Sequence, residues 1–130
     1  MPPSTPGTET RTATVTLDRD GFVVVRVRPD VPQTLADAQA NLAAAISESG
    51  EPRRPIMVDI RKAVPLTAEV RRYYSGKVLI DTFTAMALLV NASPLGRMIG
   101  NVYLRVANTF IPTRLFTDES SARRWLSTQQ

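Results

Sequence analysis

Polar and hydrophobic positions alternate near the start of the sequence, and this pattern predicts two strands. In residues 12–18 small apolar side chains share one parity and threonines occupy the other, which is typical of a half-buried strand. Residues 22–28 read FVVVRVR and end at a proline. The Asp20-Gly21 pair between the two runs is a common hairpin turn. We therefore expect an opening β-hairpin.

The pattern changes to helical spacing in residues 34–49. Thr34 is a suitable N-cap, and Asp37 stands three residues later as the partner of a capping box. Gly50 is placed to end the helix. The expected apolar face consists of Leu35, Ala38, Leu42, Ala45 and Ile46.

Three further helices are predicted from their N-terminal residues. Thr67 is the expected N-cap of the second helix and Asp118 that of the last one. Ser93 followed by Pro94 predicts an N-cap and a first helical residue for the third helix. The expected buried stripe of the third helix consists of Leu95, Met98, Ile99, Val102 and Val106, and that of the last helix of Ala122, Trp125 and Leu126.

Short apolar runs predict central strands at residues 56–60 and 83–90. A further short strand is expected at residues 113–116, directly after Pro112. The element order is then β-β-α-β-α-β-α-β-α, which favours an α/β domain with a mixed sheet of about five strands and about four helices. We expect a single domain over residues 12–130. Residues 1–11, rich in Pro, Ser and Thr, predict a disordered lead-in. Residues 77–81 are expected to form one further turn.

Composition narrows the possible chemistry. The chain has neither cysteine nor histidine, which excludes disulfides, thiolate catalysis and histidine-based acid–base or metal chemistry. The formal net charge of +4 comes without a nucleic-acid-binding motif, so we expect no nucleic-acid partner. The longest apolar run, residues 84–90, is too short to cross a bilayer. These observations predict a cytoplasmic protein without membrane insertion, metal or cofactor.

Several short motifs are similar to those of the STAS/SpoIIAA-like superfamily, and especially to small bacterial STAS/SEC14-domain-like proteins of unknown role. The motifs are Pro55-Ile-Met-Val-Asp59, Thr67-x-Glu69-x-Arg71, Ala87-Leu-Leu-Val90, Ser93-Pro94-Leu-Gly-Arg97-x-Ile-Gly-Asn101, Pro112-x-Arg114-x-Phe116 and Ala122-x-x-Trp125-Leu126. The resemblance implies a STAS-like fold and a non-enzymatic regulatory task. It also implies a phosphorylatable residue after the 56–60 strand, for which Thr67 is the nearest candidate.

The expected binding site lies where the parallel strands end, because ligands and partners of such sheets usually bind there. The residues that we expect to form it are Arg61, Lys62, Thr67, Arg71, Ser93 and Arg97. No catalytic set is visible at this edge. We therefore predict a non-enzymatic protein-interaction or regulatory module, with an unidentified protein partner and homodimerisation as an open possibility.

Other interpretations remain open at this point. The alternative function is a carrier or sensor of a small apolar or anionic ligand, with Tyr73, Tyr74 and Phe83 lining a SEC14-like pocket. Asp59 is expected to accept backbone hydrogen bonds or to pair with Arg61 or an arginine of the next helix. Gly96 and Gly100 share one helix face, which favours close contact with a neighbouring helix or with a second subunit.

Overall fold

A computed structural model describes residues 7–50, 53–74, 82–107 and 111–129 of the chain. The turn predicted at residues 77–81 and the side chain of Val106 lie outside the described residues. The same is true of residues 1–6 of the predicted lead-in.

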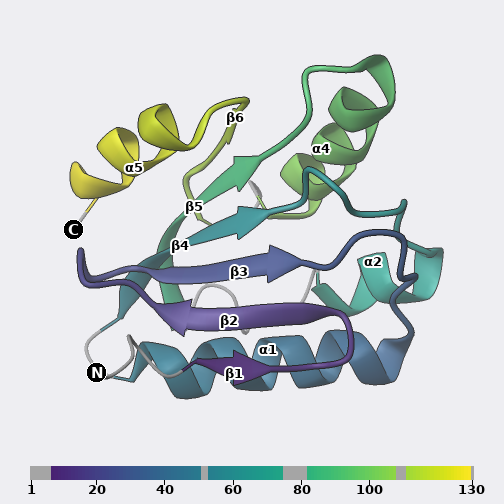
Figure 1. Cartoon of the computed structure of the whole chain (residues 1–130), viewed down its shortest axis with the longest axis horizontal. Coiled ribbons are helices and arrows are strands. Elements are labelled where there is room, and N and C mark those ends of the chain that lie inside the picture. Colours follow the sequence, from purple (N-terminus) through teal and green to yellow (C-terminus); the bar gives the residue numbers. More distant parts are fainter. Residues whose placement is uncertain (1–6, 51–52, 75–81, 108–110, 130) are drawn as a thin grey trace.

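Six strands form one mixed sheet, and their order in the sheet is their order in the chain (Figure 1). The first three strands pair antiparallel, and each strand from β3 onwards is parallel to the next. The strands are β1 (Thr8–Glu9), β2 (Ala13–Leu17), β3 (Val23–Val27), β4 (Arg54–Asp59), β5 (Phe83–Leu89) and β6 (Thr113–Phe116).

Four helices are described: α1 (Leu35–Ser49), α2 (Ala68–Tyr74), α4 (Pro94–Ala107) and α5 (Glu119–Ser127). Alternate residues of a strand point to opposite faces of the sheet. Val23 and Ile56 pack with α1 and α4 on one face, whereas Val24 and Met57 pack with α5 on the other. Helix α2 contacts both α1 and α4. Among the described helices, α5 is therefore the one that covers the second face, and it is the last of them in the chain (Figure 1).

The predicted α/β class and the mixed sheet are confirmed. The sheet has six strands where about five were expected, and the described residues form the four helices named above. The helix starts also agree with the sequence. Asp37 and Thr34 form the reciprocal capping box of α1, and Asp118 accepts a hydrogen bond from the backbone N–H of Ser121 at α5. Gly50 caps the end of α1 with a positive φ of 58°, as expected for a residue without a Cβ.

Two predictions about the first elements are wrong. Strand β1 lies inside the segment that we expected to be disordered, because Thr8 and Glu9 pair with Val15 and Thr14 of β2. On α1, Ile46 was expected in the core but is 40% exposed. The neighbouring turns instead bury Asn41, whose amide donates a hydrogen bond to Thr12 Oγ1 at 2.8 Å. The hydrogen-bonded side chains of Asn41 and Thr12 thus occupy part of the space in which apolar side chains were expected.

Candidate binding surface at the strand ends

The residues predicted for binding all follow β4 or β5 at the carboxyl edge of the sheet. Arg61 and Lys62 lie in the turn after β4, whereas Ser93 and Arg97 lie at the start of α4 after β5. The side-chain amide of Asn91 donates a hydrogen bond to the backbone oxygen of Arg61 at 2.6 Å. This bond joins the two loops and brings four predicted residues into one region.

The start of α4 is held closely against the same loop. The hydroxyl of Ser93 accepts a hydrogen bond from the backbone N–H of Gly96 at 3.1 Å, which confirms its N-cap role. A Cβ added at Gly96 would lie 2.5 Å from Asn91 Cβ and 2.6 Å from Asn91 O. Glycine therefore allows the first turn of α4 to pack directly on the loop.

Two large apolar side chains of α4 are exposed beside these residues. Leu95 is 57% exposed and Met98 51% exposed, so their predicted place in the core is wrong. Ile99 is buried as predicted, and Gly100 is the other buried residue among the described side chains of α4. A Cβ at Gly100 would lie 2.8 Å from Val90 Cγ1.

The two glycines of α4 therefore do not face another helix or a second subunit. Gly96 meets the loop after β5, and Gly100 meets Val90 and Leu115 of the same sheet edge. This close approach rotates the helix so that the glycine side is buried. The longer side chains of Leu95 and Met98 consequently project from the domain.

The charges at this edge include unpaired cations. Among the residues that the structure describes, no carboxylate forms an ion pair with Lys62 or Arg97. The Arg97 side chain donates only to the backbone oxygen of Ala92, at 3.2 Å. We define the strand-end surface as Arg61, Lys62, Ser93, Leu95, Arg97 and Met98.

Thr67 and Arg71 have local roles on α2. The Thr67 hydroxyl accepts a hydrogen bond from the backbone N–H of Val70 at 3.3 Å, as expected for an N-cap. Arg71 donates to the backbone oxygen of Leu66 at 2.8 Å. Within the described part of the chain, no hydrogen bond or ion pair joins either residue to α4. Their contacts are local to α2 and the loop before it, so we define the strand-end surface without them.

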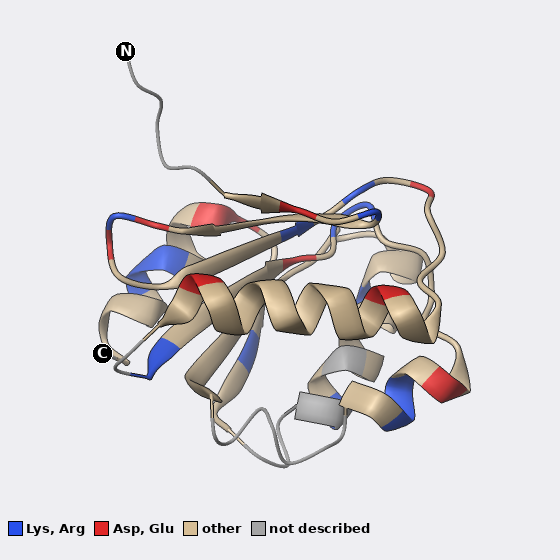
Figure 2. Cartoon of the chain, turned by 90° about the horizontal axis from the view of Figure 1, so that it is seen from below, with Lys and Arg blue, Asp and Glu red and all other residues tan. Residues whose placement is uncertain are grey.

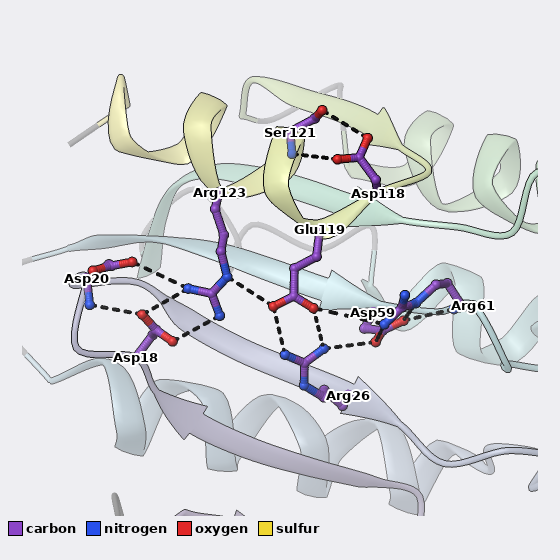
Figure 3. A network of polar contacts seen from close by, with 9 residues as sticks. All are labelled: Asp18, Asp20, Arg26, Asp59, Arg61, Asp118, Glu119, Ser121 and Arg123. Carbon is purple, nitrogen blue, oxygen red and sulfur yellow. Dashed lines mark hydrogen bonds and ion pairs between the residues drawn. The ribbon is translucent and has the colours of Figure 1, made fainter.

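Arg61 differs from the other cations because it belongs to a network of ion pairs (Figure 3). Its guanidinium donates twice to the Asp59 carboxylate, at 3.0 and 2.9 Å. This pairing agrees with one of the partners predicted for Asp59. The second partner is Arg26 of β3, at 3.0 Å, and not an arginine of the next helix. Arg26 and Asp59 are neighbours in the parallel register of β3 and β4.

The network continues from the sheet to α5. Arg26 makes two parallel hydrogen bonds of 3.1 Å to Glu119, and Arg123 donates to the same carboxylate at 3.0 Å. Arg123 also bonds twice to Asp18 at 3.2 Å. Figure 3 shows Arg26 between Asp59 and Glu119, and Arg123 between Glu119 and the hairpin carboxylates.

These contacts shift the protonation of the carboxylates in the network. Burial raises the pKa of Asp59, but the hydrogen bonds and charge of Arg61, with the hydrogen bond of Arg26, outweigh it, so the net pKa is lowered. The hydrogen bonds from Arg26 are the main cause of the lowered pKa of Glu119. These carboxylates are therefore held ionised by arginines, as expected for structural ion pairs and not for a general acid.

The aromatic residues suggested for a ligand pocket pack within the protein. Phe83 is completely buried in the main core. Tyr73 packs against the same core, and the Tyr74 hydroxyl donates to Gln33 Oε1 at 2.8 Å. Each of the three has a structural role.

Neither metal binding nor membrane crossing is indicated by the described part of the chain. Its acidic residues form no group of three or more that is arranged to hold a metal ion. None of its helices combines the length and apolar character needed to cross a bilayer.

Sequence reasoning missed Leu95 and Met98 as surface residues, although one signal was present. Helical residues are spaced by about 100°, so Leu95, Met98 and Val102 fall within about 60° of one another, on a flank of the stripe through Gly96, Ile99 and Gly100. Glycines at helical spacing indicate the face that is approached most closely. Taking that face as the buried one would have placed Leu95 and Met98 outside the core.

Comparison with known proteins gives a family without a known role. The profile of the family "Domain of unknown function (DUF7793)" matches residues 16–130. A crystal structure of a protein with unknown function from Arthrobacter sp. FB24 is 29% identical in sequence, and the match covers 87% of this chain and 97% of that chain with a TM-score of 0.33. No curated protein matches the sequence.

These findings overturn the resemblance to the STAS/SpoIIAA-like superfamily, because the family found is a different one. The motifs behind the resemblance are common to many strand–loop–helix units: a strand ending in aspartate, a capped helix and a Ser-Pro helix start. In this protein Asp59 serves an ion-pair network, and Thr67 caps α2. The phosphorylation site that the resemblance implied at Thr67 is withdrawn with it.

Proposed function

The chain belongs to the DUF7793 family, and we propose that it is a non-enzymatic protein-interaction module that binds its partner through the strand-end surface. The observation that carries this proposal is the exposure of Leu95 and Met98, at 57% and 51%, next to cations without carboxylate partners. Exposed apolar side chains that cluster inside a polar rim are typical of protein-binding surfaces.

The rigidity of this surface supports the same conclusion. Ser93 caps the helix, Asn91 bonds to the Arg61 backbone, and Gly96 lets the first turn pack on the loop. A surface that is ordered before binding loses less conformational entropy when its partner docks. The fixed loop and helix start therefore favour recognition of a protein partner.

The side chains at this edge also favour binding over catalysis. The strand-end surface offers apolar contact, a hydroxyl used as a helix cap, and cations. The nearest carboxylate, Asp59, accepts hydrogen bonds from Arg61 and Arg26 and is thereby occupied. Proton transfer needs a group whose pKa lies near the working pH, and the lowered pKa of Asp59 points the other way.

The proposal is tested by capture from cells with matched baits. The test bait carries Leu95→Ser and Met98→Ser, and the control bait carries Ile46→Ser, which changes an exposed apolar residue on α1. We expect quantitative mass spectrometry to find a protein retained by the wild type and by the Ile46→Ser bait, but depleted from the Leu95→Ser/Met98→Ser bait. Equal retention by all three baits would contradict the proposal.

A further inference from the structure

Resting on the proposed function, we infer that the partner presents an acidic segment whose carboxylates flank one or more apolar side chains. The apolar side chains contact Leu95 and Met98, and the carboxylates contact Arg97 and Lys62. The inference comes from the distribution of charge and apolar surface around this helix.

Charge is segregated between the two longest helices. Helix α4 contains Arg97 and Arg105 and no acidic residue, whereas α1 contains Asp37 and Glu48 and no basic residue. Figure 2 shows α1 with acidic segments only. The α4 side of the domain therefore attracts anionic groups, and the attraction is strongest at low ionic strength.

A basic residue of α4 lies next to its exposed apolar side chains. Arg97 precedes Met98 directly, and among the described residues its guanidinium is bonded only to the Ala92 backbone. Lys62 adds a cation from the β4 loop, which Asn91 joins to the start of α4. An apolar side chain with carboxylates on both sides complements this arrangement.

Arg61 contributes less positive charge to this surface than its position suggests. Its guanidinium is paired with Asp59 and lies 4.0 Å from Glu119. Two acidic side chains therefore already neutralise it. The inferred carboxylate contacts fall on Arg97 and Lys62 and not on Arg61, which distinguishes the two arginines experimentally.

A second copy of the chain fits this surface poorly. A symmetric contact centred on Leu95 and Met98 of two α4 helices would bring Arg97 of one copy close to Arg97 of the other. Like charges brought together at an interface reduce affinity. Of the two acidic residues of α1, Asp37 is already paired with Arg11 and Glu48 accepts a hydrogen bond from Thr8, so α1 of another copy offers little compensating charge.

An anionic membrane fits less well than a protein. Helices that lie in a membrane interface insert a complete apolar face. In α4, Ile99 and Gly100 are buried within the domain, and Leu95 and Met98 remain as its large exposed apolar side chains among those described. Two exposed apolar side chains are too few for insertion into a membrane, but they suit a contact with a protein.

The test is selection from a naive library of random peptides of about twelve residues displayed on phage, a length that covers about one face of a 14-residue helix. We expect the enriched peptides to contain Asp or Glu on both sides of Leu, Phe, Trp or Met. For a synthesised enriched peptide, Leu95→Ser with Met98→Ser should weaken binding at least about tenfold, as for residues at the centre of an interface. Ile46→Ser should leave binding unchanged.

Charge reversal tests the acidic component separately. Arg97→Glu should weaken binding of the enriched peptide about three- to tenfold at low salt, and a peptide with one carboxylate replaced by Lys should restore part of the loss. Arg61→Met should have a smaller effect than Arg97→Met. Added salt should weaken the wild-type complex more than the Arg97→Met complex.

The outcomes separate this inference from the proposed function. Enriched peptides that need Leu95 and Met98 but carry no excess of acidic residues would overturn the acidic partner and leave the interaction module standing. Peptides that bind equally to the Leu95→Ser/Met98→Ser variant, or no enrichment at all, would overturn both. A dimer in light scattering that Leu95→Ser abolishes, or co-sedimentation with phosphatidylglycerol vesicles that needs Leu95, would replace the acidic segment by a second copy or a membrane.

Discussion

The ion-pair network under α5 and the strand-end surface on α4 both contain arginines near the strand ends, but they use them differently. In the network, Arg26 and Arg123 each contact at least two carboxylates within 3.4 Å. At the strand-end surface, Arg97 contacts a backbone oxygen, and exposed apolar side chains lie beside it. The same residue type therefore fixes a helix in one region and remains available for binding in the other.

The difference shows that charge alone does not identify a site. Arg26 is a cation at the end of a strand, but its bidentate bonds to Glu119 leave little capacity for a partner. Arg97 carries the same charge, but the described residues near it provide no carboxylate. The decisive property is whether the fold itself supplies the counter-charge.

Acid should have the largest effect on the network. Burial raises the pKa of Asp18, but Arg123 and the other contacts lower it overall, and the pKa of Asp59 and that of Glu119 are also lowered. As the pH falls below about 4, the unfolded chain binds protons first, so the stabilisation is lost while the pH falls towards the folded pKa values. We expect the free energy of unfolding to change little between about pH 7 and 5 and to fall steeply below about pH 4.

The measurement is urea unfolding followed by the fluorescence of Trp125, the single tryptophan of the chain, which lies on α5. Asp37, whose pKa is also lowered, mainly by hydrogen bonds from Arg11, contributes on the other face of the sheet. The variant Arg26→Met separates the two contributions, because it should flatten the acid dependence without reaching Asp37. If the free energy of unfolding of this variant depends on pH as steeply as that of the wild type, the acid sensitivity does not come from the network around Arg26.

A matched pair of substitutions compares the two regions directly. Arg26→Met should lower the free energy of unfolding by about 2 kcal/mol, because the buried Asp59 and the half-buried Glu119 lose a shared partner. Arg97→Met removes the same group from an exposed position and should change stability by less than about 0.5 kcal/mol. Equal losses in chemical denaturation would show that the two arginines are structurally equivalent.

Gly96→Ala tests how the binding region is held. An added Cβ would contact backbone and Cβ atoms of Asn91 below 3.0 Å, so the helix start must move. We expect a loss of about 1 kcal/mol, since the strain exceeds the gain in helix propensity from replacing glycine. Binding of an acidic peptide should weaken at the same time, although no exposed side chain is changed. Thermal unfolding measures the stability of the variant, and titration calorimetry measures its peptide binding. Increased stability would show that the loop at Asn91 moves to accommodate the Cβ without strain.

The smallest effect on stability is expected for the strand-end surface itself. Leu95→Ser and Met98→Ser remove exposed apolar side chains, so each should alter the free energy of unfolding by less than about 0.5 kcal/mol. Binding of the partner should nevertheless be lost. A loss of more than about 2 kcal/mol in differential scanning calorimetry would indicate that these side chains belong to the core.

Local signals in the sequence were sufficient for helix starts and parallel strands. Thr34 with Asp37, Ser93 with Pro94, and Asp118 each placed a helix correctly because a cap acts within four residues. Strand β1 could not be found in this way, because its two residues gain their structure from pairing with β2. The pairing of Asp59 with Arg26 depends on the register between strands 33 residues apart, for which the local sequence carries no signal.

The candidate site was predictable in position but not in composition. Arg61, Lys62, Ser93 and Arg97 follow predicted parallel strands, so the sequence correctly predicted that they lie at one edge of the sheet. The exposure of Leu95 depends on the rotation of α4, which contacts at Gly96 and Gly100 determine. The apolar residues of α4 cover a wider part of the helix surface than the sheet can contact. The sequence therefore does not show which of them face the sheet, because this depends on packing.

The arrangement of α5 has a consequence for biosynthesis. Strands are added to the sheet in the order in which they leave the ribosome, so each new strand finds its neighbour already made. The apolar residues Phe22, Val24 and Met57, however, are covered by Ala122 and Leu126 of α5. Until α5 has left the ribosome, the apolar residues on this face of the sheet would be exposed to solvent. Ribosome-associated chaperones would meet the protein in that form.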